Sequence, residues 1–570
     1  MDSIESAPPS TKPTNGDVAR IFERIADVLE IQGENPYKIK AYRNAVETLR
    51  SLDEPVSSIA EDNRLDSIPG FGDAIRAKIG DILLTGTTNL YDRVKDAVPE
   101  GVIEMLQLPG IGGKTVKQLY EKLGITTIEA LEKAIDEGKI ATVAGMGEKT
   151  ADKIRQSIER GRRFAGGIRQ NSAGHIAANI IESLNERAEL SSLAVAGELR
   201  RGCDTIDAVD IVGVSTDFAA SLDAFTTLPT VDKIVERTDA SARCLLHNGA
   251  AVELTLTDSA NFVNLLFRKT GSTSHVSRVT ELATALEVTL PVAPSDEAEI
   301  YAAIGLPSIP AVVRENSGEI EASAQGKLPR LITLEDIRGD VHAHTTATDG
   351  DFSIEQMAAA ALSKGYEYMA ITDHSHSLAM VGGLTPDRLR AQIAEIRALE
   401  DSMGIRVFAG SEVDIKADGT LDFDDDLLAE LDFVIASAHL YNNQNRWAQT
   451  KRMIKAIENP HVDLIAHPTG RIILRRDPYD VDVDALIKAA ARTGTALEIN
   501  ASPARLDLKD EYARAAAQAG VKIMINTDAH RIIEYDVMHY GITTAQRAWL
   551  TADDVVNTRP LAEFEAWLKR

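Results

Sequence analysis

After Asp340 the chain repeats one pattern, a short apolar run that ends in polar residues and is followed by a helical stretch. The runs read YMAITD, RVFAGSEV, FVIASAH, LIAHPTG, ALEINAS and KIMINTD. Short apolar runs between helices are typical of buried parallel strands. Repeated βα units with polar strand ends predict a barrel, whose site lies at the carboxyl ends of the strands.

These polar strand ends carry most of the chain's histidine, since nine of the 12 histidines lie after residue 340. Residues two apart on a strand share a face, so neighbouring motifs can direct several side chains at one ion. A single His is more often a hydrogen-bonded loop residue, but a motif at every strand end favours a metal site. His376, His461 and His539 lie outside the pattern. The candidate metal ligands are His342, His344, Asp349, His374, Glu412, His439, His467, Asp528 and His530.

The cysteine count and the net charge restrict the kind of metal site and the mode of nucleic-acid binding that this chain can have. The two cysteines, Cys203 and Cys244, exclude a disulfide framework, so a metal site uses imidazole and carboxylate ligands that suit Zn, Mn or Fe. The net charge of −26 argues against coating nucleic acid by bulk electrostatics, but residues 17–170 hold 23 basic and 25 acidic residues and can present a basic face.

Length and hydropathy indicate three or four domains in a cytoplasmic chain without a membrane span or a secretory signal. Residues 1–16 are rich in Pro, Ser and Thr and are predicted to be a disordered tail. Residues 17–165 read as amphipathic helices, including IFERIADVLEI and NPYKIKAYRNAVETLRSL, with Pro36 at a helix start. From about residue 190, the runs LAVAGEL, AVDIVGV, AAVELTLT and NLLFRKTG predict strands of a small α/β sheet.

Three glycine-containing segments in the helical region follow one pattern, Ile68-Pro-Gly-Phe-Gly, Leu108-Pro-Gly-Ile-Gly-Gly-Lys and Val143-Ala-Gly-Met-Gly-Glu-Lys. Glycines permit a tight turn that aims backbone N–H groups and a helix N-terminus at a phosphate. One such segment could be an ordinary turn, but three resemble helix-hairpin-helix motifs, which grip the DNA backbone without reading sequence. The candidate DNA-binding residues are Gly70, Gly72, Gly110, Gly112, Lys114, Gly145, Gly147 and Lys149.

The C-terminal motifs DVHAHTTATDG, ITDHS, GSEVDI, ASAHL, IAHPTGR, EINASPARLDL and NTDAH resemble the PHP (polymerase and histidinol phosphatase) domain. The resemblance implies a distorted barrel around three metal ions, Mn²⁺ or Zn²⁺ with Fe as a further option. It implies that one ion is held by His342, His344, Glu412 and Asp528, a second by Glu412, His439 and His467, and a third by Asp349, His374 and His530. Two close ions can clamp the attacking and leaving oxygens of a phosphoryl displacement. Arg471, Arg475 and Arg505 are candidate phosphate clamps, with ordinary surface arginine as the alternative.

The whole chain resembles the bacterial family X DNA polymerases, which join a polymerase-beta-like core to a PHP domain. Matches include GELRRG leading to Asp210, KTGSTSH, and IYAAIGLPSIPAVVRENSGEIEAS. The resemblance implies a lyase-like helix-hairpin-helix domain over 17–98, a fingers-like helical domain over 99–168, a nucleotidyltransferase-like palm over 169–288, a thumb-like remnant and linker over 289–333, and the barrel over 334–570. Lys78 matches the family's Schiff-base lysine, although a DNA-contacting lysine is the simpler reading. Arg201, Gly271 and Ser272 match nucleotide contacts.

The palm departs from the family pattern at its centre. Two-metal nucleotidyl transfer needs carboxylates two apart on one strand and a third on a neighbouring strand. Here Ala208 precedes Asp210, and the third carboxylate is Glu253. Glu198 replaces a serine that contacts the triphosphate, and its charge would repel an incoming nucleotide. Together these changes predict a palm that holds Mg²⁺ or Mn²⁺ weakly and polymerises weakly or not at all.

The leading hypothesis is a DNA-repair enzyme that binds gapped, nicked or 3′-ended DNA and hydrolyses phosphodiester bonds at the barrel site, as a monomeric 3′–5′ exonuclease or 3′-end phosphatase. A second hypothesis is an active gap-filling polymerase that uses deoxynucleotides, with Asp204 or Asp207 recruited by a bulge. A third makes the polymerase-like half a non-catalytic DNA-binding platform. A fourth assigns a small phosphate monoester as the substrate.

Overall fold

The computed structural model describes residues 13–569 except 53–54, 69, 96, 107, 109–110, 165–166 and 188. Most of the predicted tail and the candidate residue Gly110 lie outside the described residues. The chain forms two compact units, residues 1–165 and 166–570, and each is described by itself. None of the described helices is long and apolar enough to cross a membrane.

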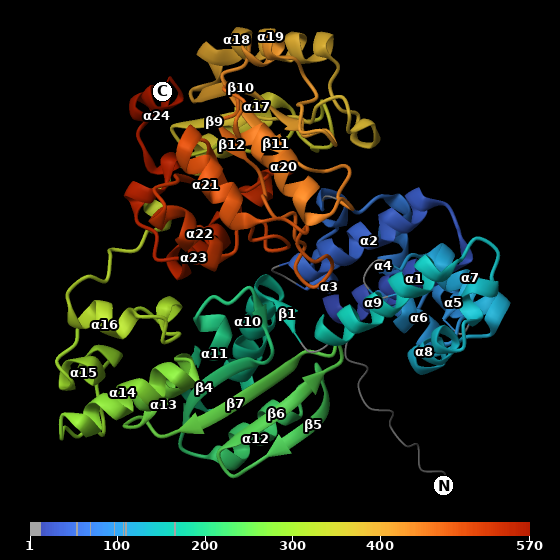
Figure 1. Ribbon diagram of the computed structural model, residues 1–570. Coiled ribbons are helices and arrows are strands. Elements are labelled where there is room, and N and C mark those ends of the chain that lie inside the picture. The colour runs from blue at the N-terminus through green and yellow to red at the C-terminus, as the bar shows by residue number, and fades with distance from the viewer. Residues whose placement is uncertain are drawn as a thin grey trace. The chain divides into compact units, whose positions relative to one another are not determined.

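The first unit is helical and has one hydrophobic core, which runs from Val18 to Ile158. The two helical segments predicted from the sequence, 17–98 and 99–168, therefore share a core. Helix α1 packs against α2, α4, α5, α6 and α7 (Figure 1). Its helices are α1 (Asn15–Gln32), α2 (Pro36–Ser51), α3 (Val56–Glu61), α4 (Asp73–Thr85), α5 (Asn89–Val94), α6 (Glu100–Leu106), α7 (Gly113–Leu123), α8 (Ile128–Asp136) and α9 (Glu148–Phe164), with short 3₁₀ turns η1 (Leu65–Ser67) and η2 (Lys139–Thr142).

Local sequence explains the ends of the first two helices. The Thr14 hydroxyl and the Asp17 carboxylate form a capping box at the start of α1, and Gly33 ends that helix with φ of +77°. Helix α1 thus includes the last two residues of the predicted tail. Asn35 caps α2, and Pro36 occupies its first position, as the sequence predicts.

The second unit opens with a five-stranded sheet of order β2-β4-β7-β6-β5. Strands β4 and β7 are parallel and the other pairs are antiparallel. Helices α10 and α12 pack on the sheet (Figure 1). The elements are β1 (Ile168–Arg169), α10 (Gln170–Arg187), β2 (Leu190–Val195), α11 (Gly197–Arg200), β3 (Thr205–Ile206), β4 (Val209–Ser215), α12 (Phe218–Thr226), β5 (Val231–Arg237), β6 (Ser241–Leu246) and β7 (Ala251–Thr257).

One predicted strand is wrong, because NLLFRKTG belongs to helix α13 (Phe262–Thr270). A short apolar run fits a buried strand and a buried helix equally, and its packing decides between them. Phe267 of α13 packs in a small core with residues of α14 (Thr273–Ala285), α15 (Glu297–Ala303) and α16 (Glu319–Ala324). The short turns η3 (Ala311–Val313) and η4 (Leu334–Asp336) lie on the path to the barrel.

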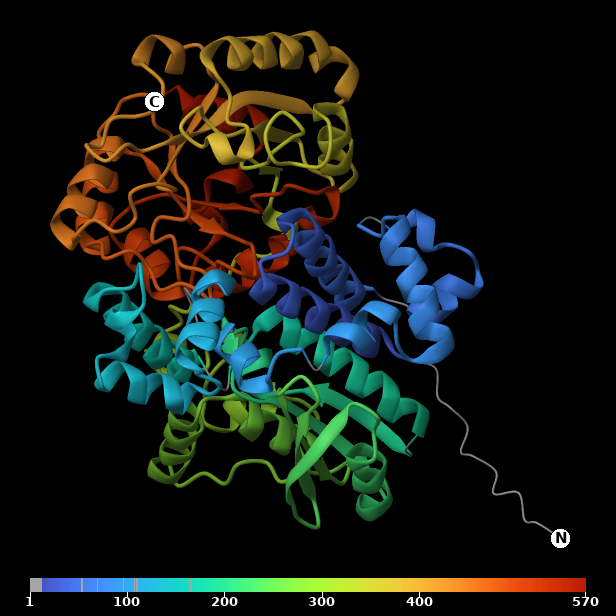
Figure 2. The same cartoon turned by 90° about the vertical axis from the view of Figure 1, so that its right-hand side faces the viewer.

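The rest of the second unit is a barrel of seven parallel strands with helices outside them (Figures 1 and 2). The strands run in sequence order from β8 to β14. They are β8 (Gly339–Asp340), β9 (Tyr368–Ile371), β10 (Arg406–Asp414), β11 (Phe433–Ser437), β12 (Leu464–Ile465), β13 (Ala496–Asn500) and β14 (Ile523–Asn526). The helices are α17 (Ile354–Ser363), α18 (Pro386–Met403), α19 (Asp425–Leu428), α20 (Arg446–Ile457), α21 (Val483–Thr493), α22 (Asp510–Gln518), α23 (Met538–Arg547) and α24 (Leu561–Leu568), with turns η5 (Ala379–Val381), η6 (Ile532–Val537), η7 (Ala552–Asp554) and η8 (Val556–Thr558).

The ring of strands closes beyond the ends of β8 and β14. Ala343 forms a parallel bridge with Ala529, and the His344 N–H donates to the Ala529 carbonyl at 2.8 Å. Alternate strand residues, such as Tyr368 and Ala370, point into the ring, where Phe564 and Trp567 of α24 join their cluster. The side chains that point into the ring are apolar at this level. At the carboxyl ends of the strands the inward-pointing side chains are polar, and these form the candidate metal site.

Candidate metal centre

All nine candidate ligands meet at the carboxyl ends of the barrel strands. Glu412 lies in β10, and the others lie in the segments that follow β8, β9, β11, β12 and β14. Several of them extend inward-facing rows by the two-residue period of a strand, as His374 extends the row of Tyr368 and Ala370. The same period leads from Met524 of the interior cluster to Asp528.

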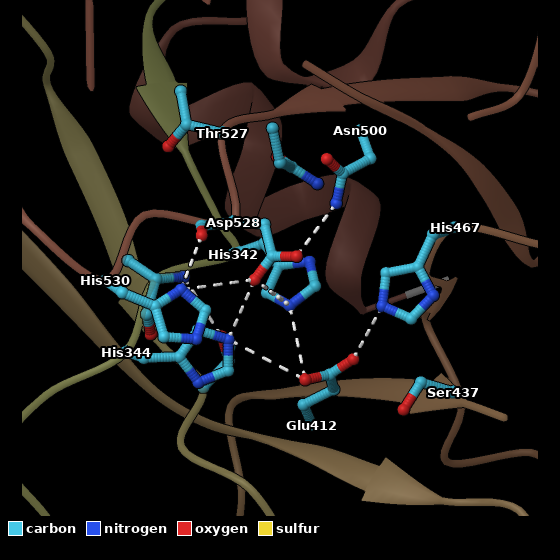
Figure 3. A network of polar contacts seen from close by, with 12 residues as sticks. His342, His344, Glu412, Ser437, His467, Asn500, Thr527, Asp528 and His530 are labelled. Carbon is cyan, nitrogen blue, oxygen red and sulfur yellow. Dashed lines mark hydrogen bonds and ion pairs between the residues drawn. The ribbon is translucent and has the colours of Figure 1, made fainter. Parts of the chain in front are cut away.

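A first group forms on one side of Glu412. His342 Nε2 lies 3.5 Å from both Glu412 Oε2 and Asp528 Oδ1. His344 Nε2 lies 3.1 Å from Asp528 Oδ1 and 3.6 Å from Glu412 Oε2. Figure 3 shows the Glu412 carboxylate between this group and His467. The backbone of Asp528 is left-handed, with φ of +56°, which turns its side chain into the group.

A second group forms at the other oxygen of Glu412. His467 Nε2 lies 3.1 Å and His439 Nε2 lies 3.3 Å from Glu412 Oε1. The two oxygens of Glu412 therefore face different imidazoles, Oε1 those of His439 and His467, and Oε2 those of His342, His344 and His374.

A third group surrounds Asp349. His374 Nε2 lies 3.5 Å from Asp349 Oδ1, and His530 Nε2 lies 3.4 Å from Asp349 Oδ2. The rings of His344 and His530 stack with centroids 4.3 Å apart, which joins this group to the first. The nine candidate ligands therefore lie together, with His344 and His374 each belonging to two neighbouring groups, since His374 Nδ1 also lies 2.9 Å from Glu412 Oε2.

The chemistry of this donor set fits bound cations. His342 Nε2, His344 Nδ1 and Asp349 Oδ1 are buried and have no hydrogen-bond partner within the described part of the chain. A buried polar atom without a partner is costly unless something binds it. Their spacing from neighbouring ligand atoms, 3.5 to 4.0 Å, leaves room for an ion between them.

The charges of the buried ligands also favour the binding of cations at this site. Burial opposes ionisation of Glu412, yet the charges of His439, His374 and His342 hold its pKa well below the usual range. Burial lowers the pKa of His342, but Asp528, Glu498 and Glu412 bring that pKa well above its usual value. The buried carboxylates therefore draw positive charge into the site, which protons or metal ions can supply.

Supporting residues missed by the sequence reasoning orient these ligands. Glu498 accepts from His342 Nδ1 at 2.8 Å and from the His467 N–H at 2.8 Å. Asn500 donates to Asp528 Oδ2 at 3.0 Å. The signal was present in the sequence, because Ala496, Glu498 and Asn500 form one inward row of β13 that turns from apolar to polar.

The three candidate phosphate clamps have different surroundings. Arg505 Nε lies 3.7 Å from Asp528 Oδ2, and burial together with the charge of Arg505 lowers the pKa of His467, so Arg505 faces the site. Arg475 is exposed. Arg471 is engaged within the protein, because its side chain binds Asp204 Oδ2 of the sheet domain at 2.8 Å and the Arg505 carbonyl at 2.8 Å.

In the helical unit, the three glycine segments form the same turn. The N–H groups of Phe71, Ile111 and Met146 donate to the carbonyls of Ile68, Leu108 and Val143. Each of these central residues is buried and anchors its turn to the core.

The glycines serve two purposes in these turns. Gly70 and Gly145 have φ of +86° and +85°, where other residues are strained. Gly72, Gly112 and Gly147 immediately precede α4, α7 and α9. A Cβ at these three positions would meet open space. Lys114 and Lys149 are exposed in the first turns that follow. These helix N-termini are accessible to a phosphate.

Lys78, the candidate lyase residue, lies in α4. Its Nζ donates to the Ala74 carbonyl at 3.0 Å and lies 5.9 Å from the centre of the Tyr42 ring. These are contacts of a partly exposed lysine on its own helix, compatible with a DNA-contacting role.

The two candidate catalytic carboxylates of the palm-like sheet lie beside cationic side chains, unlike the carboxylates of the barrel site, which lie beside imidazoles. Asp210 and Glu253 are register partners on the parallel strands β4 and β7. Lys269 Nζ lies 2.5 Å from Glu253 Oε1, and Arg243 is the register partner of Glu253 on β6. Lys269 is therefore ion-paired with one member of this carboxylate pair, while burial raises the pKa of the other, Asp210, to about 6. Neither Asp204, bound to Arg471, nor the exposed Asp207 joins this pair.

The candidate nucleotide-binding residues make hydrogen bonds or ion pairs with other residues of the second unit. Arg201 Nε binds Glu315 at 2.9 Å, and its Nη1 donates to the Thr270 carbonyl at 2.9 Å. Ser272 caps α14 by accepting from the His275 N–H, and Gly271 precedes it. The Glu198 carboxylate accepts from the Asp207 N–H at 2.7 Å.

The fold and the site define a class, a PHP-type metal-dependent phosphoesterase barrel attached to a nucleotidyltransferase-like sheet and to helix-hairpin-helix turns. Family models agree: a helix-hairpin-helix domain matches residues 13–88, a SAM-like helix-hairpin-helix tandem matches 102–160, and a PHP domain matches 340–502.

Among curated proteins, the chain is 39% identical to the DNA polymerase/3′-5′ exonuclease PolX of Bacillus subtilis (strain 168), over 97% of this chain and 99% of that protein. Probable phosphatases of Thermoanaerobacter sp. (strain X514) and Shewanella sediminis are each 30% identical to it over 40% of the chain and 94% of their own length. The chain belongs to the PolX family of bacterial family X DNA polymerases with a PHP domain.

Proposed function

We propose that this protein is a DNA-repair enzyme that binds nicked, gapped or 3′-ended DNA through its glycine turns and hydrolyses phosphodiester bonds from the 3′ end at the barrel site. The observation that carries the proposal is the convergence of nine His, Asp and Glu side chains, eight of them in three groups that share His344 and His374, with His467 3.1 Å from Glu412. The name of the Bacillus relative includes 3′-5′ exonuclease activity, which supports the same reaction.

Each side chain has a role in this scheme. His342, His344, Glu412 and Asp528 would hold one ion, Glu412 with His439 and His467 a second, and Asp349, His374 and His530 a third. When bound, Mn²⁺ or Zn²⁺ supplies water activation and charge stabilisation for phosphoryl transfer. Glu412 and Glu498 keep the imidazoles oriented from within the protein. Arg505 would pair with the phosphate, because its guanidinium lies beside the candidate ligand Asp528, with Nε 3.7 Å from Oδ2.

We further propose that the palm-like domain binds DNA without incorporating nucleotides. Lys269 is ion-paired with Glu253, the register partner of Asp210, and Arg201 is bound by Glu315. A triphosphate would have to displace these contacts and would also meet the Glu198 carboxylate. Deoxynucleotides are therefore not expected as substrates, despite the polymerase named in the relative.

A gapped duplex labelled at its 5′ end tests the proposal. Incubation of the full chain with Mn²⁺, with and without nucleotides, should shorten the labelled strand in both cases. The His342→Ala/His344→Ala variant should leave the strand intact and still retard it in a gel, because the helical unit is unchanged. Shortening at an unchanged rate by that variant would refute the site, and extension in the presence of nucleotides would refute the proposed role of the palm.

A further inference from the structure

Most of the large apolar side chains that remain exposed in the barrel lie on the connections that follow the ligand-bearing strands. Single exposed apolar residues are common in soluble proteins, but several around one site mark a binding surface. Only two others in the described part of the barrel region, Leu334 and Leu362, lie elsewhere. The remaining five follow ligand-bearing strands in the chain: Met380 comes after β9, Tyr441 and Trp447 after β11, and Ile532 and Ile533 after β14.

Tyr441 has the most unusual setting among them. It lies two residues after His439, so their Cα atoms are within about 7.6 Å of each other. Its side chain is 53% exposed, although its backbone is left-handed with φ of +59°. Bulky residues rarely adopt this conformation, and it persists only where the surroundings impose it.

A buried arginine imposes that conformation. Arg452 is 1% exposed, and its guanidinium donates to the carbonyls of Leu440 at 2.9 Å and of Tyr441 at 3.2 Å. Asn442 donates to the His439 carbonyl at 2.7 Å. The loop that carries a metal ligand is thus fixed from beneath, while the Tyr441 ring is held in solvent.

A second exposed ring lies on the same connection between β11 and α20. Trp447, in the first turn of α20, is 71% exposed. Lys451 Nζ lies 5.0 Å from the centre of the indole ring, and the neighbouring Arg446 is ion-paired with Asp480 and Asp482 at 3.7 and 3.6 Å. Exposed rings flanked by cations are the side chains that single-stranded nucleic acid uses, because bases stack on the rings and phosphates pair with the charges.

We propose that Tyr441 and Trp447 form a stacking platform for the unpaired bases at a DNA 3′ end, beside the phosphate to be hydrolysed. The inference rests on the proposed nuclease function and adds a positioning role for residues that hold no metal. It commits to a nucleic acid, since a small phosphate monoester offers no base to stack, and Lys451 beside the Trp447 ring can pair with a backbone phosphate.

Digestion of two single-stranded substrates tests the platform. One oligonucleotide has ordinary thymines at its 3′ end, and the other carries abasic residues at its last three positions. Wild type with Mn²⁺ should digest the ordinary end about tenfold faster or more, because one stacked base contributes on the order of tenfold in affinity. Tyr441→Ala should remove most of this difference by raising KM, whereas Tyr441→Phe should keep it.

Control variants separate the possible failures. Leu362→Ala changes an exposed apolar side chain on α17 and should behave as wild type. Full activity of His342→Ala/His344→Ala would overturn the proposed function itself. Normal digestion by wild type with an unchanged base preference in Tyr441→Ala would overturn the platform alone. A change of oligomeric mass in Tyr441→Ala with unchanged digestion would also overturn it, in favour of a contact between copies.

Fluorescence gives a readout that needs no hydrolysis. The chain has three tryptophans, and Trp447 is the most exposed, while Trp567 is 9% exposed. In chelator, oligothymidine should quench the emission of wild type, and an abasic oligomer should not. Trp447→Phe should lose the quenching. Equal quenching by both oligomers, or quenching retained in Trp447→Phe, would contradict stacking at this residue.

Discussion

The Lys269 ammonium lies 2.5 Å from the Glu253 carboxylate, on the sheet position where a polymerase palm would bind metal ions. Glu253 is in turn the register partner of Asp210. In a two-metal centre, divalent ions supply the positive charge next to such carboxylates. Here the Lys269 ammonium, a part of the protein, supplies a positive charge at this place.

Nucleotide incorporation should therefore be absent. We expect the His342→Ala/His344→Ala variant, which cannot degrade its primer, to extend no gapped substrate with Mg²⁺ or Mn²⁺ and all four deoxynucleotides. Primer extension resolved on a sequencing gel measures this. Extension that disappears on the additional change Asp210→Asn would show that the palm polymerises.

The stability of the second unit should depend on Asp210 and on pH. Burial raises the pKa of Asp210 to about 6, with Lys269 opposing and Glu253 adding to the shift. Because the folded pKa exceeds the unfolded value of 3.8, the protonated form stabilises the fold below that value, and this contribution is lost as pH rises through 6.

Asp210→Asn should thus raise the free energy of unfolding at pH 7.5 by about 1–3 kcal/mol, with a smaller gain at pH 4.5. Calorimetry in chelator at both pH values measures the difference. A variant that is less stable than wild type at pH 7.5 would show that the pairing with Lys269 outweighs the cost of burial.

Removing metal should destabilise the barrel. Ions that bind only the folded state add about 3–4 kcal/mol at 100 to 1,000 times the dissociation constant. Chelation should therefore lower the Tm of the barrel transition and abolish hydrolysis, and added Mn²⁺ should restore both. The His342→Ala/His344→Ala variant should respond weakly, and an equal response in that variant would place the ions elsewhere.

Glu498 should act as a positioning residue for the metal ligands. It accepts from His342 Nδ1 and from the His467 backbone, but its oxygens are not needed as ligands. Glu498→Gln should weaken metal affinity or hydrolysis by about 10- to 100-fold. Titration of metal-free protein with Mn²⁺ measures the affinity, and Glu355→Gln, exposed on α17, is the matched control. Unchanged affinity and rate would reduce Glu498 to a structural residue.

The glycine turns should bind DNA through its phosphates. Lys114→Ala and Lys149→Ala remove exposed charges beside the N-termini of α7 and α9. Each change should lower affinity on all sequences and reduce the slope of log K against log salt by about 1. Fluorescence anisotropy across a salt series measures the slope. A slope equal to that of wild type in both variants would move the DNA contact away from these turns.

Sequence by itself determined the barrel, its nine ligand candidates and the repeated turns, because these depend on residue type and local spacing. His342 and His344 share a strand end by the two-residue period, and Gly70 and Gly145 permit left-handed turns. Only the tertiary structure decided that NLLFRKTG is helical, that Arg471 binds Asp204, and that Glu498 orients His342. The two side-chain contacts join residues that are distant in the sequence, and many other partners would have been equally plausible from residue type alone. Tertiary packing decides among them, as it does for the pair of Lys269 and Glu253.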